Sequence, residues 1–198
     1  MIDDFYEQAA VVTYPVSLAE VKLWCKLSTS TVEDTLLNSL ITAATEAAEK
    51  YTNRLFISRT VTGYYAFLDG SSDFENGYFI TLRRAPVTAV TTVKVYVDDV
   101  LTTIEATEYN LKQSNGGFSR IVFEEVNDSP DYGPYPYQVA FTAGYGVATA
   151  VPEMIKTAIK ETIANWYQNR GDCGSGSELP SIAKGILGAY RISNTFSC

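Results

Sequence analysis

The spacing of apolar residues changes twice along this chain of 198 residues, and this change constrains the fold class. Near both ends, apolar side chains recur at three- and four-residue steps, which is the period of an amphipathic helix. In the middle, short β-branched and aromatic segments are separated by Gly, Asn, Asp and Pro, as in strands joined by turns. The pattern predicts an α+β fold: a small helical bundle of about four helices, with a β-rich insertion between the second and third long helices.

A chain with 46% apolar residues can bury a core, so we expect a single domain over residues 1–198. Its expected parts are N-terminal helices over 14–56, the β-rich insertion over 57–142, a long helix over 150–170, a flexible Gly/Ser-rich linker over 171–178, and a C-terminal helix and tail over 179–198. The strands expected within the insertion are 60–67, 78–82, 90–97, 100–104, 109–112, 120–123 and 138–142.

Local signals predict where the first two helices begin and end. Ser17 and Glu20 have the spacing of a capping box, which predicts a helix of about three turns over residues 16–27. Ser30 or Thr31 is the expected cap of the second helix, whose apolar face starts at Val32 and which ends near Asn53. Among the strands, Asp98-Asp99 between two valine-rich segments predicts a tight hairpin.

The residue types present disfavour catalysis and metal binding. The chain has no histidine, which is the commonest general base and a frequent metal ligand. Its three cysteines, Cys25, Cys173 and Cys198, are widely spaced and form no CxxC pair, so we expect free thiols and no zinc site. We therefore expect no catalytic residue, no metal, no cofactor and no enzymatic activity. Carboxylate chemistry stays an alternative, although adjacent acids such as Glu124-Glu125 point to opposite faces of a strand.

The overall charge and hydropathy bear on location and partners. The net charge of −8 disfavours a protein that grips nucleic acid through phosphates, although a local basic patch stays open. No apolar run of about 18 residues is present, so we expect no membrane span. The acidic N-terminus differs from a secretory signal, and we expect the chain to stay in the cytoplasm where it is made. The 14 tyrosines suit interfaces as well as cores.

Several segments, in order, carry a resemblance to a known family. They are residues 36–46 (LLNSLITAATE), 51–56 (YTNRLF), 82–90 (LRRAPVTAV), 139–146 (VAFTAGYG), 151–156 (VPEMIK) and 165–170 (NWYQNR). The FTAGYG…VPE and NWYQNR segments are the most specific. Taken together, the chain resembles the head–tail connector, or adaptor and head-completion, proteins of tailed bacteriophages, related prophages and gene transfer agents. The resemblance runs from about Tyr14 to Arg191.

This resemblance implies a helical bundle with a β-rich insertion and a structural role in the virion, at the head–tail neck, with assembly in the host cytoplasm. Family members form a ring, usually of twelve copies, below the portal protein. The ring extends the DNA channel and provides a docking platform for a stopper or tail-completion protein. The implied partners are therefore the portal, the stopper or tail protein, further copies of the chain, and double-stranded DNA that passes through without sequence-specific binding. No membrane is involved.

Family members commonly contact the portal through their C-terminal segment, and the resemblance carries this role to seven residues here. They are Tyr190, Arg191, Ile192, Ser193, Asn194, Thr195 and Phe196. A disordered chain end is the alternative for the same residues. The alternative for the whole chain is a tail or baseplate protein whose β-rich region, with the loop at 127–136, binds a receptor or glycan.

Overall fold

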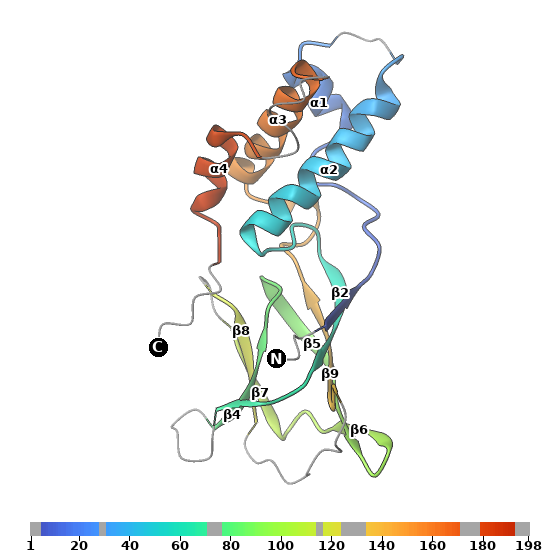
Figure 1. The fold of residues 1–198 in the computed structure, drawn as a ribbon, viewed down its shortest axis with the longest axis vertical. Helices are drawn as coiled ribbons and strands as arrows, with labels where there is room; N and C mark the ends of the chain where they lie inside the picture. Colours follow the sequence, from blue (N-terminus) through green and yellow to red (C-terminus); the bar gives the residue numbers. More distant parts are fainter. Residues whose placement is uncertain are drawn as a thin grey trace. The chain divides into compact units, whose positions relative to one another are not determined.

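The computed structural model describes residues 5–27, 31–70, 77–113, 117–123, 134–170 and 179–192. Within these residues it contains four α-helices and two antiparallel sheets, and all strands except the first lie between the second and third helices, which confirms the predicted α+β class (Figure 1). The chain divides into two compact units. One comprises Met1–Ala10 and Ser58–Gly144, and the other comprises Val11–Ile57 and Tyr145–Cys198. We refer to them as the β unit and the helical unit.

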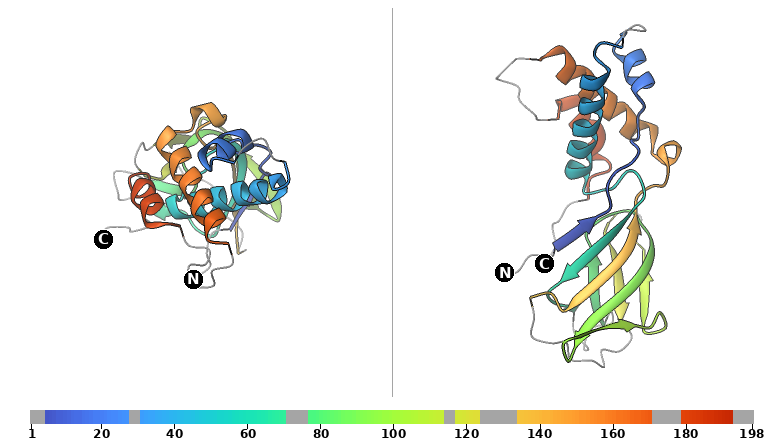
Figure 2. Two further views of the ribbon diagram at one scale, coloured as in Figure 1. Left: turned by 90° about the horizontal axis from the view of Figure 1, so that it is seen from above. Right: turned by 90° about the vertical axis from the view of Figure 1, so that its right-hand side faces the viewer.

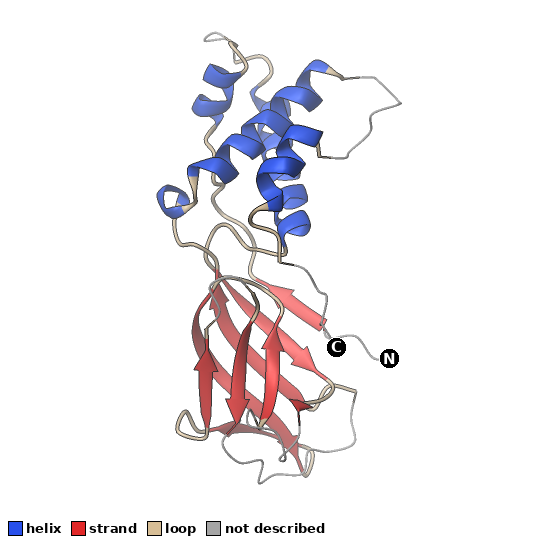
Figure 3. Ribbon diagram, turned by 90° about the vertical axis from the view of Figure 1, so that its left-hand side faces the viewer, coloured by secondary structure: helices blue, strands red, loops and turns tan. Residues whose placement is uncertain are grey.

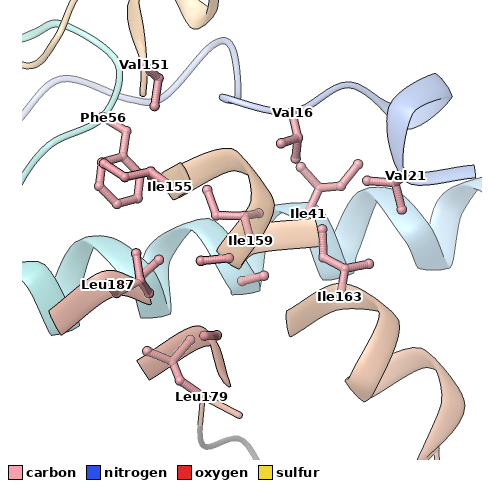
Figure 4. Packing of buried hydrophobic residues seen from close by; sticks show 14 of the residues in the cluster. Val16, Val21, Ile41, Phe56, Val151, Ile155, Ile159, Ile163, Leu179 and Leu187 are labelled. Carbon is pink, nitrogen blue, oxygen red and sulfur yellow. The ribbon is translucent and has the colours of Figure 1, made fainter. Parts of the chain in front are cut away.

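The helical unit contains the helices α1 (Leu18–Trp24), α2 (Asp34–Thr52), α3 (Glu153–Gln168) and α4 (Ser181–Gly188), with a short 3₁₀ turn at Ala148–Ala150. Apolar side chains from all four helices meet in one core, which Figure 4 shows from close by. These side chains recur at three- and four-residue steps, so each helix turns one stripe inward. The buried stripes are Leu37, Ile41, Ala44 and Ala48 on α2, Ile155, Ala158, Ile159 and Ile163 on α3, Val21 on α1, and Ala183 and Leu187 on α4.

The predicted capping box at the start of α1 is confirmed. The Glu20 N–H donates to Ser17 Oγ at 3.3 Å, and the Ser17 N–H donates to Glu20 Oε2 at 2.7 Å. The helix has seven residues, which is shorter than the three turns predicted. It ends because Lys26 takes a left-handed conformation, with a φ of 55°, and its N–H donates to the carbonyl of Leu23.

The predicted start of α2 is wrong, whereas its predicted end is confirmed. The helix begins at Asp34, and the N-cap residue Glu33 makes no side-chain capping bond, because its carboxylate instead binds Tyr167 on α3 and Arg170 just beyond it. Thr31 therefore does not cap the helix, and Ser30 lies outside the described residues. Val32 is 89% exposed and does not belong to the apolar face. At the other end, Asn53 adopts the left-handed conformation of a helix C-cap.

The β unit contains nine strands among its described residues: β1 (Phe5–Gln8), β2 (Arg59–Tyr65), β3 (Asp69–Gly70), β4 (Tyr78–Leu82), β5 (Val87–Val97), β6 (Val100–Ile104), β7 (Tyr109–Lys112), β8 (Ser119–Phe123) and β9 (Tyr137–Ala143). They form a five-stranded sheet in the order β1-β2-β9-β5-β6 and a four-stranded sheet in the order β3-β4-β8-β7. All seven predicted strands are present. Strand β1 and the two-residue strand β3 were not predicted from the sequence.

The two sheets form two layers of the β unit. The right panel of Figure 2 and Figure 3 show the β unit from opposite sides, so that one layer is in front in the first view and the other layer in the second. Alternate residues are buried, as expected of strands with one face on a core. On β9 these are Tyr137, Val139, Phe141 and Ala143, and on β8 they are Ser119, Ile121 and Phe123.

The hairpin predicted at Asp98-Asp99 is confirmed. These two residues connect β5 to β6 and both have positive φ values, 52° and 60°. Two consecutive left-handed residues form a type I′ turn, whose twist matches that of the flanking strands. Aspartate tolerates this conformation better than most residues, which explains why the turn forms without glycine.

Candidate functional site

The first three residues of the expected portal-contact segment, Tyr190–Ile192, follow the C-cap residue of α4, Ala189, and we call them the tail root. They lie against the C-terminal end of α2. The Ile192 N–H donates to the carbonyl of Thr52 at 3.0 Å, and the Ile192 carbonyl accepts from Asn53 Nδ2 at 2.8 Å. The Ile192 side chain is buried, with 3% of its surface exposed. Both backbone groups of Ile192 are therefore bound at the point where the described chain ends.

Arg54 binds the other end of the tail root. Its Nε–H donates to the Tyr190 carbonyl at 2.6 Å. Arg54 also lies near Tyr145, whose backbone N–H donates to the Phe56 carbonyl at 3.1 Å. Burial raises the pKa of Tyr145 above its ordinary value of 10.0, and the nearby Arg54 charge opposes this rise. Arg54 thus binds the tail root beside the turn that precedes α3.

Tyr51 completes the contact surface beneath the tail root. The Arg191 guanidinium lies 5.1 Å from the centre of the Tyr51 ring, a cation–π geometry. The Tyr51 hydroxyl donates to the Lys184 carbonyl on α4 at 3.4 Å. Four consecutive residues, Tyr51 to Arg54, therefore contact α4 or the tail root. We call this group the α2 anchor.

The portal-contact role of the tail root stays a prediction, and nothing in the sequence interpretation pointed to the α2 anchor that contacts it. The segment 51–56 was noted only as one of the motifs that carry the resemblance. A usable signal was present, since Asn53 at a helix end favours a left-handed C-cap and leaves its amide side chain free to bind a backbone group. Ser193, Asn194, Thr195 and Phe196 lie outside the described residues, so their position is not part of the site's geometry.

A second polar cluster joins the start of α2 to the end of α3. Arg170 Nη1 donates to Glu33 Oε1 at 2.7 Å, the Tyr167 hydroxyl donates to Glu33 Oε2, and the Arg170 guanidinium lies 4.4 Å from the centre of the Tyr167 ring. These hydrogen bonds, first from Tyr167 and then from Arg170, lower the pKa of the Glu33 carboxyl. The cluster holds the NWYQNR end of α3 against α2.

The remaining candidates from the sequence are the three cysteines and the adjacent acids Glu124 and Glu125. Cys25 is half-buried, and burial raises the pKa of its thiol. Cys173, Cys198, Glu124 and Glu125 lie outside the described residues. Within the part of the chain that the structure describes, no group of three or more His, Cys, Asp or Glu side chains is placed to hold a metal ion. In that same part, none of the helices has the length and apolar character needed to cross a membrane.

The chain matches a family model over residues 16–175, and the family is described as head completion protein. No curated protein sequence matches it. Three solved structures are similar over 98% of this chain and 98% of theirs. They are the neck of an empty gene transfer agent particle computed with C6 symmetry (23% identity, TM-score 0.75), the virion of a native gene transfer agent particle (22%, 0.73) and the neck of a native particle computed with C12 symmetry (21%, 0.69). At these identities the similarity is one of fold.

Proposed function

The chain belongs to the head completion protein family, and from this membership we propose that it is a structural subunit of the head–tail neck of a phage-like particle. In this role, copies of the chain form a ring below the portal protein, extend the DNA channel and provide a surface for a stopper or tail-completion protein. The observation that carries the proposal is the family match over residues 16–175, which includes the α2 anchor and the cluster of Glu33, Tyr167 and Arg170 but not the tail root. Chains of similar fold occur in particle necks computed with C6 and C12 symmetry.

The geometry of the tail root supports portal contact by the C-terminal segment. Ile192 is held through its N–H, its carbonyl and its buried side chain. A segment that starts from a bound residue leaves the helical unit at one defined point, which lowers the entropic cost of docking it to a partner. The role of residues 190–196 as portal contacts is therefore part of this proposal.

The net charge of −8 supports a channel that DNA passes through rather than binds. Acidic side chains repel phosphates, so an acidic lumen lets the duplex slide. A basic lumen in the assembled ring would contradict this part of the proposal.

The proposal is tested with a chain that ends after Ile192 and keeps the whole tail root. We expect the shortened chain to have the same thermal midpoint as the full chain but to lose binding to the portal, as measured by the mass of mixtures with purified portal. A matched control replaces residues 193–198 by a Gly/Ser segment of equal length, which separates the loss of specific side chains from the loss of length. Undiminished portal binding by both variants would contradict portal contact through this segment.

The location of the chain separates this function from the alternative of a receptor- or glycan-binding tail protein. Electron microscopy of particles that carry a labelled chain should show the label at the neck. A label at the tail tip would favour the alternative.

A further inference from the structure

Four large apolar side chains lie on the surface where α1 ends and α2 begins. The ion pair between Lys22 and Asp34 joins these two helix ends, so the four side chains belong to one part of the helical unit. Single exposed apolar residues are common, but a group of large ones is typical of an interaction surface. Their exposed fractions are 82%, 42%, 89% and 37%, and we call them the α1 corner: Leu23, Trp24, Val32 and Leu36.

The helical period explains why the end of α1 is exposed while its core face is covered. Val21 is fully buried, and Leu23, two residues further on, lies on the opposite side of the helix. The Lys160 ammonium of α3 lies 5.1 Å from the centre of the Trp24 ring, in a cation–π geometry. The Trp24 ring is thus held in place while part of it stays exposed. A tryptophan that is already ordered contributes binding area at a low entropic cost.

The outward face of α4 has the opposite character, because it consists of small residues. Ser181, Gly185 and Gly188 are exposed and recur at four- and three-residue steps. A Cβ at Gly185 or Gly188 would have nothing within 4 Å, and neither glycine has a positive φ. Glycine is unfavourable inside a helix. The fold of the single chain therefore does not explain Gly185, whereas another chain that packs closely on α4 does.

Helices α1 and α4 lie on opposite sides of α3 within the helical unit. Both pack against α3, and Figure 1 and the left panel of Figure 2 show one of them on each side. A ring requires two different, complementary surfaces on each copy. The large side chains of the α1 corner and the small residues of α4 meet this requirement.

The charges of the two units favour contact between copies through the helical unit. The residues of the β unit include fourteen acidic and six basic ones, so this unit carries the whole net charge of −8, whereas the helical unit has nine of each. Identical copies therefore repel each other through their β units and not through their helical units. The two surfaces are also compatible in sign, since residues 179–192 contain two basic and no acidic residues and residues 17–36 contain three acidic and two basic ones.

We propose that the α1 corner of one copy packs on the small-residue face of α4 in the neighbouring copy, with Leu23 and Trp24 against Gly185. This inference rests on the proposed ring and identifies the surfaces that form it. The partner is a second copy of this chain. Contact between two α1 corners would instead close a two-fold dimer, because it uses the same surface twice.

The substitution Gly185→Gln should have opposite effects on the isolated chain and on the ring. A side chain at this position meets nothing within 4 Å, and glutamine favours a helix more than glycine does, so the thermal midpoint of the isolated chain should stay equal or rise. In the ring the longer side chain takes the space of the neighbouring α1 corner. We therefore expect Gly185→Gln to lose ring assembly with purified portal, as measured by mass.

A matched control places the same side chain on another helix. Ala43 is exposed on α2, and Ala43→Gln should assemble like the unsubstituted chain. Undiminished assembly of Gly185→Gln would overturn the inference. Equal loss of assembly in Gly185→Gln and Ala43→Gln would also overturn it, since the effect would not be specific to α4.

Cross-linking identifies which surfaces meet. Ala19 and Ser181 are exposed and lie one helical turn before Leu23 and Gly185, so cysteines at these two positions leave the proposed contact intact. In a chain whose three cysteines are replaced by serine, Ala19→Cys is combined with Ser181→Cys, and assembled rings are treated with a short bismaleimide. Under denaturing conditions, the double variant should give a ladder of covalent oligomers and each single variant should give monomers.

The outcomes separate this inference from the proposed function. Intact rings of the double variant that give no covalent oligomer would overturn the inference and leave the neck function standing. A covalent dimer from Ala19→Cys alone would also overturn it, since that product requires two α1 corners to meet. If the unsubstituted chain formed no ring with its portal, the proposed function and the inference would both be overturned.

Discussion

Replacing Arg54 by methionine should loosen the tail root without unfolding the helical unit. The substitution keeps a long apolar side chain but removes the Nε–H that donates to the Tyr190 carbonyl at 2.6 Å. It also removes the positive charge near Tyr145. The contacts of Ile192 with Thr52 and Asn53 remain, so the change isolates one of the bonds that hold the tail root.

The size of the effect follows from the type of bond that is lost. A hydrogen bond with a charged donor contributes roughly 1.5–3 kcal/mol, and its loss leaves a partly buried carbonyl without that partner. Taking about 2 kcal/mol, and a factor of ten for every 1.4 kcal/mol, local opening of the tail root becomes about 30-fold more frequent. The apolar core lies on other faces of the helices, so the free energy of global unfolding should change much less.

Hydrogen exchange measures this opening at a single amide. The Ile192 N–H, which donates to Thr52, should exchange about 30-fold faster in Arg54→Met, while the amide of Ile159 in the core keeps its rate. Arg170→Met is the matched control, since it removes an arginine hydrogen bond to Glu33 instead. Unchanged protection of Ile192 in Arg54→Met would refute the anchoring role of Arg54. Equal acceleration in both variants would show that the effect is not local.

Three further predictions concern the stability of each unit. Ser17→Ala removes the capping box of α1 and should lower the free energy of unfolding by about 1 kcal/mol, measured by urea titration. Because the hydrogen bonds from Ser17 hold the pKa of Glu20 below its ordinary value of 4.5, their stabilisation is present above pH 4.5 and is lost as the pH falls through the lowered pKa. The difference in stability between the parent chain and Ser17→Ala should therefore shrink in acid, and a pH-independent difference would contradict this. A Cβ at Gly63 would meet the buried Tyr65 ring at 2.7 Å, so Gly63→Ala should lower the free energy of unfolding by roughly 1–3 kcal/mol. At Gly185 in α4 a Cβ would have nothing within 4 Å, so Gly185→Ala should be neutral or stabilising. Similar thermal midpoints for the two variants would argue against the close contact at Gly63.

Features that depend on a few neighbouring residues were predictable from the sequence. The capping box joins Ser17 and Glu20, which are three residues apart, and the hairpin at Asp98-Asp99 needs only two turn residues between two apolar strands. The left-handed end of α2 at Asn53 belongs to the same class. In each case the stabilising contact forms between residues of the same short segment, so the local sequence is sufficient to predict the structure of that segment.

Strand β1 shows why other elements were missed. It is four residues long and contains Glu7 and Gln8, so it has no apolar alternation that would indicate a strand. It forms because β2 offers a ladder partner, with Phe5 opposite Tyr64. Its side-chain contacts, an edge-to-face contact of Tyr6 with Tyr65 and a hydrogen bond from the Tyr64 hydroxyl to Glu7, are also with residues far along the chain, so they leave little mark on its own sequence.

The predicted start of α2 was wrong for a related reason. Local rules place a capping side chain just before the helix, but the Glu33 carboxylate accepts hydrogen bonds from Tyr167 and Arg170, which lie 134 and 137 positions away. A charged hydrogen bond with a favourable geometry outweighs a weak local capping preference.

Periodicity and turn chemistry in the sequence were thus enough to establish the α+β class, the seven main strands and the helix ends that rely on adjacent residues. Which residues come together in the candidate site could not be predicted in this way. Ile192 meets Asn53, which is 139 positions away, and Arg54 meets Tyr190, which is 136 positions away. These pairs come together because the core of the helical unit packs α4 beside the end of α2, and hydrogen bonds between residues so far apart exist only after that packing has formed.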